Sequence, residues 1–298
     1  MSVAVIINPV SGTGGGPEAG RRRAELAARV LVARGFEPVV YLTERSGHAR
    51  ELAQVAVNHG ARTVVAWGGD GTVNEVASAL VFSDARLAIV PSGSGNGLAR
   101  ELLVPFDPAR ALGVAIGPHE HAMDAGELDG HLFFNVAGIG LDARVAHRFA
   151  EQGLVGRGFS RYLAITLREI VRYEPDEYII VADDERLRSR PLLIAIANAR
   201  QYGNGALIAP QARLDDGRLD VVVVAYRSPI RALVQAPRVF LGQVGRVSGV
   251  TMRTAAEVEI RSARPVVYHL DGEPHVGGTT ISAKVHPRAL RVMVPGPR

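Results

Sequence analysis

The chain has 298 residues, 47% hydrophobic and 21% charged, so it can bury a large core and is not a disordered chain. Its net charge is only +4 at pH 7 and no stretch interleaves basic with aromatic residues, so we expect no binding to nucleic acid. The sequence contains no cysteine, which excludes disulfides, thiolate metal sites and cysteine nucleophiles.

The start of the chain enters a strand pattern directly, without a charged leader or a cleavage site. No apolar run approaches the roughly 18 residues needed to span a bilayer. We therefore expect a cytoplasmic protein whose contact with a membrane is peripheral, at the inner face.

The first part of the chain alternates between strand and helix patterns. Strands are predicted over Val3–Ile7, Pro38–Leu42, Thr63–Trp67 and Leu87–Val90. Helices are predicted over Pro17–Arg34, Ala49–Asn58, Val73–Leu80 and Leu98–Leu103, with Ser46 placed to cap the second. This alternation predicts a parallel sheet with helices on both faces.

After about residue 120 the pattern changes to closely spaced strands separated by Asp-Gly and Gly-Gly turns. The strands are predicted over Leu132–Val136, Tyr178–Ala182, Leu192–Ala197, Leu219–Val224, Val258–Arg261, Val266–Leu270 and Leu290–Val294. One helix is predicted among them, over about Phe159–Tyr173. We predict an α/β domain over 1–122 and a mainly antiparallel β-sandwich over 123–298, and the last strand or tail is free to return to the first domain.

Two glycine-rich runs stand at the ends of two successive predicted strands. Gly68-Gly69-Asp70-Gly71-Thr72 follows the third strand, and Pro91-Ser92-Gly93-Ser94-Gly95-Asn96-Gly97 follows the fourth. Such turns at the carboxyl ends of adjacent parallel strands direct backbone N–H groups into one crevice, which suits nucleotide phosphates. A conventional P-loop is excluded, because Lys284 is the only lysine. Taken alone, the first run is also compatible with an ordinary Asp-Gly turn.

Three further turns carry polar residues that favour chemistry, each with a structural alternative. Asn8, Ser11 and Gly12 fit either a strand-to-helix turn or the edge of a phosphate site. Asp271-Gly272-Glu273-Pro274 fits either a hairpin tip or a carboxylate that projects into a substrate cleft. Asp215-Asp216-Gly217-Arg218 resembles a solvated hairpin when taken alone.

The remaining polar residues give weaker signals. The nine histidines lack metal-ligand spacing, so we interpret them as turn and surface residues, and no Ser-His-Asp pattern supports a hydrolase. Arg157, Arg161, Arg168 and Arg172 form one helical stripe. We favour an ordinary packed helix with a solvated face over a helix that binds anionic lipid.

The order of these landmarks along nearly the whole chain resembles the diacylglycerol kinase catalytic-domain family, and in particular its soluble bacterial lipid kinases. The landmarks are Asn8-Pro9-x-Ser11-Gly12, Thr43, Gly68 to Glu75, Pro91 to Arg100, Asn135-x-x-Gly138-x-Gly140-x-Asp142, Asp216-Gly217-x-Leu219-Asp220 and Asp271 to Pro274. The resemblance implies an N-terminal domain like that of NAD kinases and phosphofructokinases. It also implies transfer of the γ-phosphoryl group of Mg²⁺-ATP to a lipid hydroxyl at a membrane surface.

The resemblance also implies roles for individual residues. Glu273 would accept the hydroxyl proton, and Asp70, the second catalytic residue, would hold Mg²⁺-nucleotide or order its loop. A structural Mg²⁺ would be bound by the Asp216 carboxylate and by the backbone carbonyls of Arg213 and Arg218, an oxygen-only set. The ATP contacts carried over are Asn8, Ser11, Gly12, Thr43, Gly68, Gly69, Asp70, Gly71, Thr72, Val73, Asn74, Gly93, Ser94, Gly95 and Asn96.

The sequence departs from the diacylglycerol kinase pattern at two places. Gly97 stands where an acidic residue usually follows the loop asparagine, as in sphingoid-base and ceramide kinases, so the acceptor lipid stays open between diacylglycerol-like and sphingoid-like. No lysine lies near Ser11, and Arg21 to Arg23 are candidates to replace it. Two rival functions are an NAD kinase and a nucleotide-binding regulatory protein without catalysis, and a homodimer is an assembly that the sequence leaves open.

Overall fold

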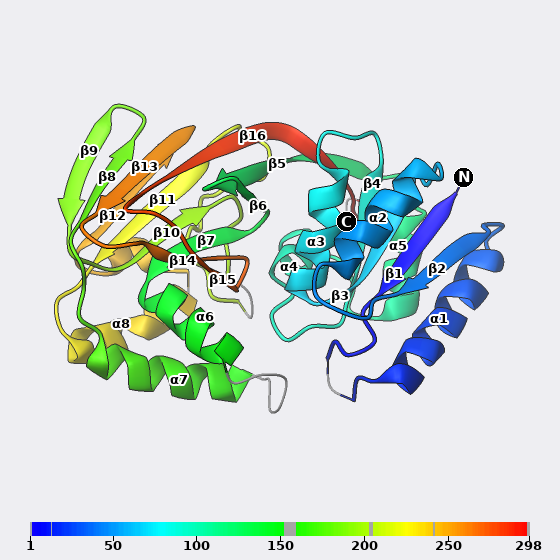
Figure 1. The fold of residues 1–298 in the computed structure, drawn as a ribbon, viewed down its shortest axis with the longest axis horizontal. Coiled ribbons are helices and arrows are strands. Elements are labelled where there is room, and N and C mark those ends of the chain that lie inside the picture. Colours follow the sequence, from blue (N-terminus) through cyan, green and yellow to red (C-terminus); the bar gives the residue numbers. More distant parts are fainter. Residues whose placement is uncertain (1, 13, 152–158, 203–204, 241, 297–298) are drawn as a thin grey trace. The chain divides into compact units, whose positions relative to one another are not determined.

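The computed structural model describes residues 2–12, 14–151, 159–202, 205–240 and 242–296. The chain forms two compact units (Figure 1). The first comprises Met1–Met123 with Arg288–Arg298, and the second comprises Asp124–Pro287. The sequence-based boundary falls between residues 122 and 123, and the structure returns the end of the chain to the first unit.

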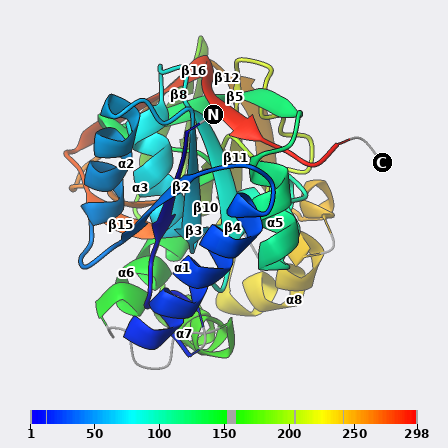
Figure 2. The ribbon, with the colours of Figure 1, turned by 90° about the vertical axis from the view of Figure 1, so that its right-hand side faces the viewer.

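The first unit is built on parallel strands in the order β2-β1-β3-β4. The strands are β1 (Val3–Ile7), β2 (Pro38–Leu42), β3 (Thr63–Gly68) and β4 (Arg86–Pro91). The helices are α1 (Pro17–Val32), α2 (His48–Asn58), α3 (Asp70–Leu80), α4 (Gly97–Glu101) and α5 (Pro108–Ala115). Helices α2 and α3 cover one face of the sheet, and α1 and α5 cover the other (Figure 2).

Burial explains the sheet. Strand β1 is a run of five apolar residues that are all buried, which is typical of a parallel strand covered by helices on both faces. The end of strand β16 (Thr280–Met293) adds to the edge of this sheet, where Arg291 and Val292 pair in parallel with Arg86 and Leu87 of β4.

The second unit contains two layers of mainly antiparallel strands. One sheet has the order β12-β11-β10-β7-β14-β15. Its strands are β7 (Val136–Gly140), β10 (Pro191–Ala197), β11 (Leu219–Ala225), β12 (Val250–Ala255), β14 (Val267–Leu270) and β15 (Glu273–Val276). The other layer contains β8 (Tyr178–Ala182), β9 (Glu185–Ser189), β13 (Glu257–Ser262) and the first part of β16, joined by β5 (Glu120–Leu128) and β6 (His131–Phe133).

The core of the second unit lies between these two layers. Ile139, Ile196 and Val223 from one sheet are buried in the same cluster as Ile180 and Ile260 from the other. Three α-helices complete the described part of this unit: α6 (Leu141–Glu151), α7 (Phe159–Arg172) and α8 (Pro229–Phe240). A short 3-10 turn, η1 (Val244–Arg246), follows α8. The predicted fold class, an α/β domain followed by an antiparallel β-sandwich, is confirmed.

Three local predictions are wrong. The β-rich part contains α6 and α8 in addition to α7, so the expectation of one helix fails. Ser46 does not cap α2: Gly47 occupies that position, and the Glu75 carboxylate accepts hydrogen bonds from the N–H groups of Gly47 and Ala49 at 2.8 and 2.9 Å. The predicted strand Leu132–Val136 is divided between β6 and β7, and the cause is a contact of Asp271 described below.

Candidate active site

The glycine-rich loops of the first unit lie at the carboxyl edge of its parallel sheet. Four loops meet this edge, one after each of β1 to β4. The strand order places β1 between β2 and β3, so the chain leaves β1 toward one side and continues from β3 toward the other. Ligands of open α/β sheets bind outside the strand ends at such a point.

The loops after β3 and β4 are packed backbone to backbone. A Cβ atom on Gly93 would lie 2.5 Å from the Cα of Gly69, and a Cβ on Gly95 would lie 2.7 Å from Oδ2 of Asp70. Because no side chain fits in these gaps, close approach of the loops requires glycine at Gly69, Gly93 and Gly95. The two glycine-rich runs that were noted in the sequence are therefore in direct contact in the folded chain.

Asp70 holds this contact in place. Its Oδ2 accepts the N–H of Asn96 at 2.8 Å and its Oδ1 accepts the N–H of Gly97 at 2.7 Å. Asn96 has a left-handed backbone conformation, and its side-chain oxygen accepts the N–H of Gly93 at 2.8 Å. Of the two roles left open for Asp70, ordering of the loop is the one for which the structure has contacts. Gly97 contributes its backbone N–H to Asp70 at the position where an acidic residue is usual.

The loop after β1 is tied to the other two. The Asn8 side-chain amide donates to the Thr72 hydroxyl at 3.0 Å, and the hydroxyl groups of Ser11 and Ser92 are 2.7 Å apart. Gly12 has a left-handed backbone (φ +77°) and a Cβ there would collide with the Ser92 carbonyl. Asn8, Ser11 and Gly12 therefore lie at the same edge as the two glycine-rich runs.

Arg23 anchors the same loop from α1. Its guanidinium donates to the carbonyl oxygens of Asn8 and Ser11 at 2.7 and 2.8 Å, and to the Ser11 hydroxyl at 3.0 Å. Arg23 is therefore engaged with the loop itself. Arg22 pairs with Glu18 at 2.8 Å on the exposed side of the helix, and Arg21 is also exposed.

The remaining predicted ATP contacts have varied surroundings. Thr43 is buried at the end of β2, where its N–H donates to the Ile7 carbonyl at 2.9 Å, whereas Ser94 is exposed. Gly71, Thr72, Val73 and Asn74 form the first turns of α3, whose N-terminus has no capping side chain among the described residues. An uncapped helix N-terminus presents backbone N–H groups with a positive partial charge.

Sequence reasoning missed two residues that shape this edge. Glu75 links α3 to the start of α2, as described above, and thereby fixes the loop after β2. Arg100 donates to the Gly95 carbonyl at 3.0 Å and stacks over the Phe106 ring at 4.6 Å. Both stand within the matched landmarks, but their partners are far away or across a turn, so spacing alone does not reveal them.

The second unit holds Glu273 next to a turn that is fastened by hydrogen bonds. Asp271 precedes it with a left-handed backbone (φ +49°), and its carboxylate accepts the N–H groups of Phe134, Asn135 and Val136 at 2.9, 2.9 and 3.1 Å. Because these N–H groups donate to a carboxylate instead of to a neighbouring strand, strand pairing is interrupted between β6 and β7. The Asp-Gly turn is thus a hairpin tip, and it is also fastened to a second segment.

Glu273 itself is exposed at the start of β15. Among the described residues, its side chain forms no hydrogen bond or ion pair. Asp271 and Glu273 therefore have different surroundings although they are two residues apart. The first accepts hydrogen bonds that hold the turn, and the second has an exposed carboxylate.

A buried polar group lies beneath this turn. His269 of β14 is 4% exposed, its Nδ1 accepts the Gly272 N–H at 3.3 Å, and its Nε2 lies 3.4 Å from Oδ2 of Asp142. The Tyr202 hydroxyl donates to the same Asp142 oxygen at 2.7 Å. A Cβ on Gly138 would collide with both Asp142 and His269, which explains a glycine at this motif position. The interpretation of the histidines as turn and surface residues is wrong for His269.

The predicted metal loop lies at the start of β11. Asp216 accepts the N–H of Arg218 at 3.0 Å, and Gly217 donates to the buried carboxylate of Asp124 at 2.7 Å. Burial, ahead of the neighbouring Asp216 carboxylate, raises the pKa of Asp220 to about 6. The Arg213 side chain lies 3.3 Å from Asp215, and that of Arg218 pairs with Asp183 at 2.8 Å.

This loop suits Mg²⁺ in its chemistry. Acidic oxygens concentrate there in a partly buried setting, and hard oxygen ligands are those that Mg²⁺ prefers. The described residues contain no group of three or more histidine, cysteine or acidic side chains placed to hold a metal ion. The predicted set needs only the Asp216 carboxylate and two backbone carbonyls, so it stays a prediction.

Hydrogen bonds connect the predicted metal loop to the Glu273 turn. The Asn198 side-chain amide donates to the carbonyl oxygens of Asp124 and Phe134, both at 3.0 Å. Asp124 accepts from Gly217 of the loop, and Phe134 donates to Asp271 of the turn. A chain of hydrogen bonds therefore links the loop at Gly217 to the turn that carries Glu273, the residue predicted to act as the base.

The chain matches two families. Residues 2–128 match the diacylglycerol kinase catalytic domain, and residues 135–294 match the YegS C-terminal NAD kinase beta sandwich-like domain. No helix in the described part of the chain is both long and apolar enough to cross a membrane.

Curated relatives cover almost the whole chain. A "Probable lipid kinase YegS-like" protein of Pseudomonas aeruginosa is 34% identical over 283 residues, which are 94% of this chain and 92% of that protein. A protein of the same description from Klebsiella pneumoniae is 30% identical over 272 residues, 90% of each chain. A solved structure of a putative diacylglycerol kinase from Bacillus anthracis has a TM-score of 0.80 at 22% identity, covering 99% of this chain and 95% of that one, and shares the fold.

Proposed function

We propose, from the premise that this chain belongs to the family of YegS-like lipid kinases, that it transfers the γ-phosphoryl group of ATP to a hydroxyl group of a lipid. The observation that carries the proposal is the carboxyl edge of the first unit, where loops rich in glycine are tied together around an uncapped helix N-terminus. That arrangement binds phosphate groups through backbone N–H groups.

The first unit would hold the nucleotide. The N-terminal turn of α3 attracts the phosphates, since its N–H groups carry the positive end of the helix dipole. Asp70, Arg23 and Asn96 keep the loops at a fixed separation, so the backbone donors need no rearrangement when charge develops during transfer. Thr43, Ser11 and Ser94 are the hydroxyl side chains proposed to contact the nucleotide.

Glu273 of the second unit would take the proton. The lipid hydroxyl oxygen forms a bond to the γ-phosphorus, the bond from that phosphorus to the bridging oxygen breaks, and ADP leaves with the bonding electrons. The hydroxyl proton passes to the Glu273 carboxylate. This residue suits the role because it is exposed, has no partner among the described residues, and stands on a turn that Asp271 fixes.

Mg²⁺ is the metal proposed at the Asp216 loop, bound by the Asp216 carboxylate and the carbonyls of Arg213 and Arg218. When bound there, it would neutralise the acidic groups of the loop and hold it in one conformation. Through the hydrogen bonds of Asp124 and Asn198, a fixed loop would also help to fix the turn that carries Glu273.

The acceptor lipid is proposed to be diacylglycerol-like or sphingoid-like. Gly97 favours the second, because sphingoid-base and ceramide kinases have a small residue at this position. The buried polar group of Asp142, His269 and Tyr202 lies next to the Glu273 turn. It is therefore a candidate neighbour of the polar end of the acceptor.

The test is transfer of label from γ-labelled ATP, with Mg²⁺, into a product that extracts into organic solvent. Diacylglycerol, monoacylglycerol, phosphatidylglycerol, sphingosine and ceramide are presented one at a time in mixed micelles. Label in the organic phase with one lipid is the expected result and identifies the acceptor. Label that appears only in a water-soluble product without lipid would point instead to an NAD kinase.

The matched control is Glu273→Gln. This change keeps the size of an exposed side chain and removes the proton acceptor, so ATP binding is retained while turnover is lost. Turnover at the wild-type level in Glu273→Gln would refute the assigned base. ATP binding by the wild type without transfer to any lipid of the panel would favour the regulatory protein.

A further inference from the structure

Two neighbouring helices of the second unit expose large apolar side chains. Leu167 and Val171 of α7 are 45% and 64% exposed, and Ile230, Leu233 and Val234 of α8 are 74%, 37% and 70% exposed. The helices pack on each other and lie at one end of the unit (Figures 1 and 2). Single exposed apolar residues are normal on a soluble protein, but a group on adjacent helices marks an interaction surface.

The core of the unit does not need these side chains. Ile165 and Ile170 on the inner face of α7, and Tyr173 directly after the helix, are buried, with Ala232 of α8 packed against them. At 3.6 residues per turn, Leu167 and Val171 fall on the opposite face of α7. On α8, Ile230, Leu233 and Val234 likewise share the face away from Ala232. Each helix therefore packs its inner face on the unit and carries a separate apolar stripe on its outward face.

Arginines border each outward stripe. Arg168 and Arg172 follow Leu167 and Val171 on α7, and Arg231 and Arg238 stand beside the stripe of α8, all four being exposed. The sequence of α8 contains no acidic residue. Positive charge is thus the only charge that α8 contributes to this surface.

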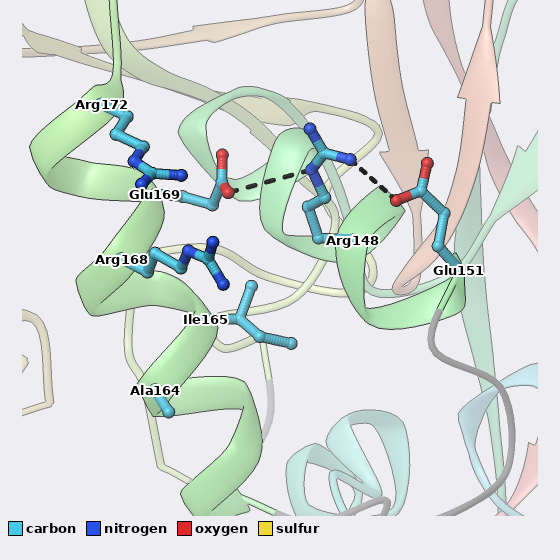
Figure 3. A pocket seen from close by; sticks show the side chains of 7 residues that line it. All are labelled: Arg148, Glu151, Ala164, Ile165, Arg168, Glu169 and Arg172. Carbon is cyan, nitrogen blue, oxygen red and sulfur yellow. Dashed lines mark hydrogen bonds and ion pairs between the residues drawn. The ribbon is translucent and has the colours of Figure 1, made fainter.

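The acidic residue of α7 is turned inward. Glu169 is 8% exposed and lies 3.8 and 3.9 Å from the guanidinium groups of Arg144 and Arg148. Beside it, between α6 and α7, is a cavity of about 490 Å³, where Arg148 lies between the carboxylates of Glu169 and Glu151 (Figure 3). Arg168 and Arg172 of α7 also line this cavity, so its lining contains three arginines and two carboxylates.

We propose that the outward faces of α7 and α8, defined by Leu167, Val171, Ile230, Leu233 and Val234 and their bordering arginines, dock the protein on an anionic lipid bilayer. The apolar stripes enter the interfacial region, and the arginines contact headgroup phosphates. This deepens the proposed function, since the acceptor of a lipid kinase resides in such a bilayer.

The charges favour a bilayer over a second copy of the chain. A two-fold interface would bring the arginines of α7 and α8 against those of the other copy, which is unfavourable without facing carboxylates. An anionic leaflet supplies the opposite charge across the whole face. The prediction that α7 is an ordinary packed helix is thus extended: its inner face packs, and its outer face is proposed to bind lipid. Arg157, the first residue of the predicted stripe, lies outside the described residues.

The test measures binding of the whole protein to vesicles by flotation, without ATP. Vesicles of phosphatidylcholine alone are compared with an equal mixture of phosphatidylcholine and phosphatidylglycerol, at low and high salt. One double variant removes apolar contact (Val171→Ser with Val234→Ser) and another removes charge (Arg168→Gln with Arg172→Gln). The control is Arg29→Gln with Val32→Ser on α1, where Val32 is 60% exposed and Arg29 is also exposed.

We expect the wild type to bind the anionic vesicles, to prefer them over phosphatidylcholine, and to lose binding as salt rises. Each α7 or α7–α8 variant should bind about tenfold less tightly or worse, because each removed arginine or apolar contact weakens binding several-fold. The control variant should bind like the wild type. All of these positions are exposed, and thermal unfolding confirms that each variant folds.

Three outcomes would overturn the docking surface: wild-type protein that ignores anionic vesicles, variants that bind as the wild type does, or an equal loss in the α1 control. A dimer that dissociates on Val171→Ser with Val234→Ser, seen by sedimentation, would assign the face to a second copy. Because flotation needs no turnover, vesicle binding without phosphoryl transfer would contradict the proposed function and leave the docking surface intact.

Discussion

The carboxylate of Asp271 offers a sharp test of how the Glu273 turn is held. It accepts three backbone N–H groups, from the buried residues Phe134, Asn135 and Val136. Asp271→Ala removes the acceptor and leaves the three donors in place. We expect this single change to destabilise the second unit strongly, because each donor loses its partner in a partly buried setting.

The size of the effect follows from the contacts. A lost hydrogen bond that leaves a donor unsatisfied costs about 1 kcal/mol or more, so three cost about 3 kcal/mol. Asp271 also has φ +49°, and alanine in the left-handed region costs about 1 kcal/mol more than aspartate, which tolerates it. Asp271→Ala should therefore lose about 4 kcal/mol. Asp271→Asn keeps the backbone conformation and one acceptor oxygen, and should lose about 2 kcal/mol.

The assay is equilibrium unfolding in urea, followed by circular dichroism. Glu273→Gln is the matched control, since Glu273 lies two residues away, is exposed, and has no partner among the described residues. Its free energy of unfolding should change by less than about 0.5 kcal/mol while its turnover is lost. Asp271 is thus assigned a structural role and Glu273 none. This assignment would be refuted by equal free energies of unfolding for Asp271→Ala and the wild type, or by a large loss of unfolding free energy in Glu273→Gln.

Three other predictions follow from the described contacts. Gly93→Ala places a methyl group 2.5 Å from the Cα of Gly69, so the two loops must separate and the KM for ATP should rise about tenfold. Gly245→Ala is the control, because the space around its Cβ position is open and the KM for ATP should stay unchanged. An equal KM for ATP in both variants would disprove the loop contact. Burial, ahead of the nearby His131 and His269, lowers the pKa of His275 below its ordinary value of about 6.5. The unfolded chain therefore binds this proton more readily, and the folded state loses stability as the pH falls through about 6.5. His275→Gln should flatten the pH dependence of the urea midpoint, and an unchanged pH dependence would exclude His275 as its source. Mg²⁺ should raise the unfolding temperature of the wild type and leave that of Asp216→Asn unchanged, and equal shifts in both would place the ion elsewhere.

Much of the first unit was predictable from the sequence because its signals are local. Strands β1 and β2 match their predicted bounds, since a short apolar run between turn residues is a local signal. The two glycine-rich runs also marked the correct sheet edge, because the ends of parallel strands meet at one side. Family landmarks then nominated Glu273 and the Asp216 loop, whose roles stay predictions.

The helices of the second unit show where local pattern fails. The α8 sequence contains Pro237, which argues against a helix interior. Pro229 at its start nevertheless fits the first turn, and Ala232 packs against the cluster that contains Ile165 and Ile170 of α7. For α6, the motif residues Gly140 and Asp142 drew attention to chemistry rather than to helical spacing. Tertiary packing decides such segments, since propensity differences are small beside burial.

The sequence by itself determined the fold class, the sheet edge at which the glycine-rich runs meet, and the family, because each is encoded in short motifs whose residues are close together in the chain. Only the tertiary structure decided which carboxylates have partners. Asp70 and Asp271 are turned to backbone N–H groups in distant segments, Glu75 caps a helix 26 residues away, and Glu273 stays exposed. Asp70, Asp271 and Glu273 stand at or next to the ends of strands or helices, and Glu75 lies within α3. What distinguishes them is the set of donors that folding brings within hydrogen-bond distance, and that set depends on long-range contacts that no local pattern records.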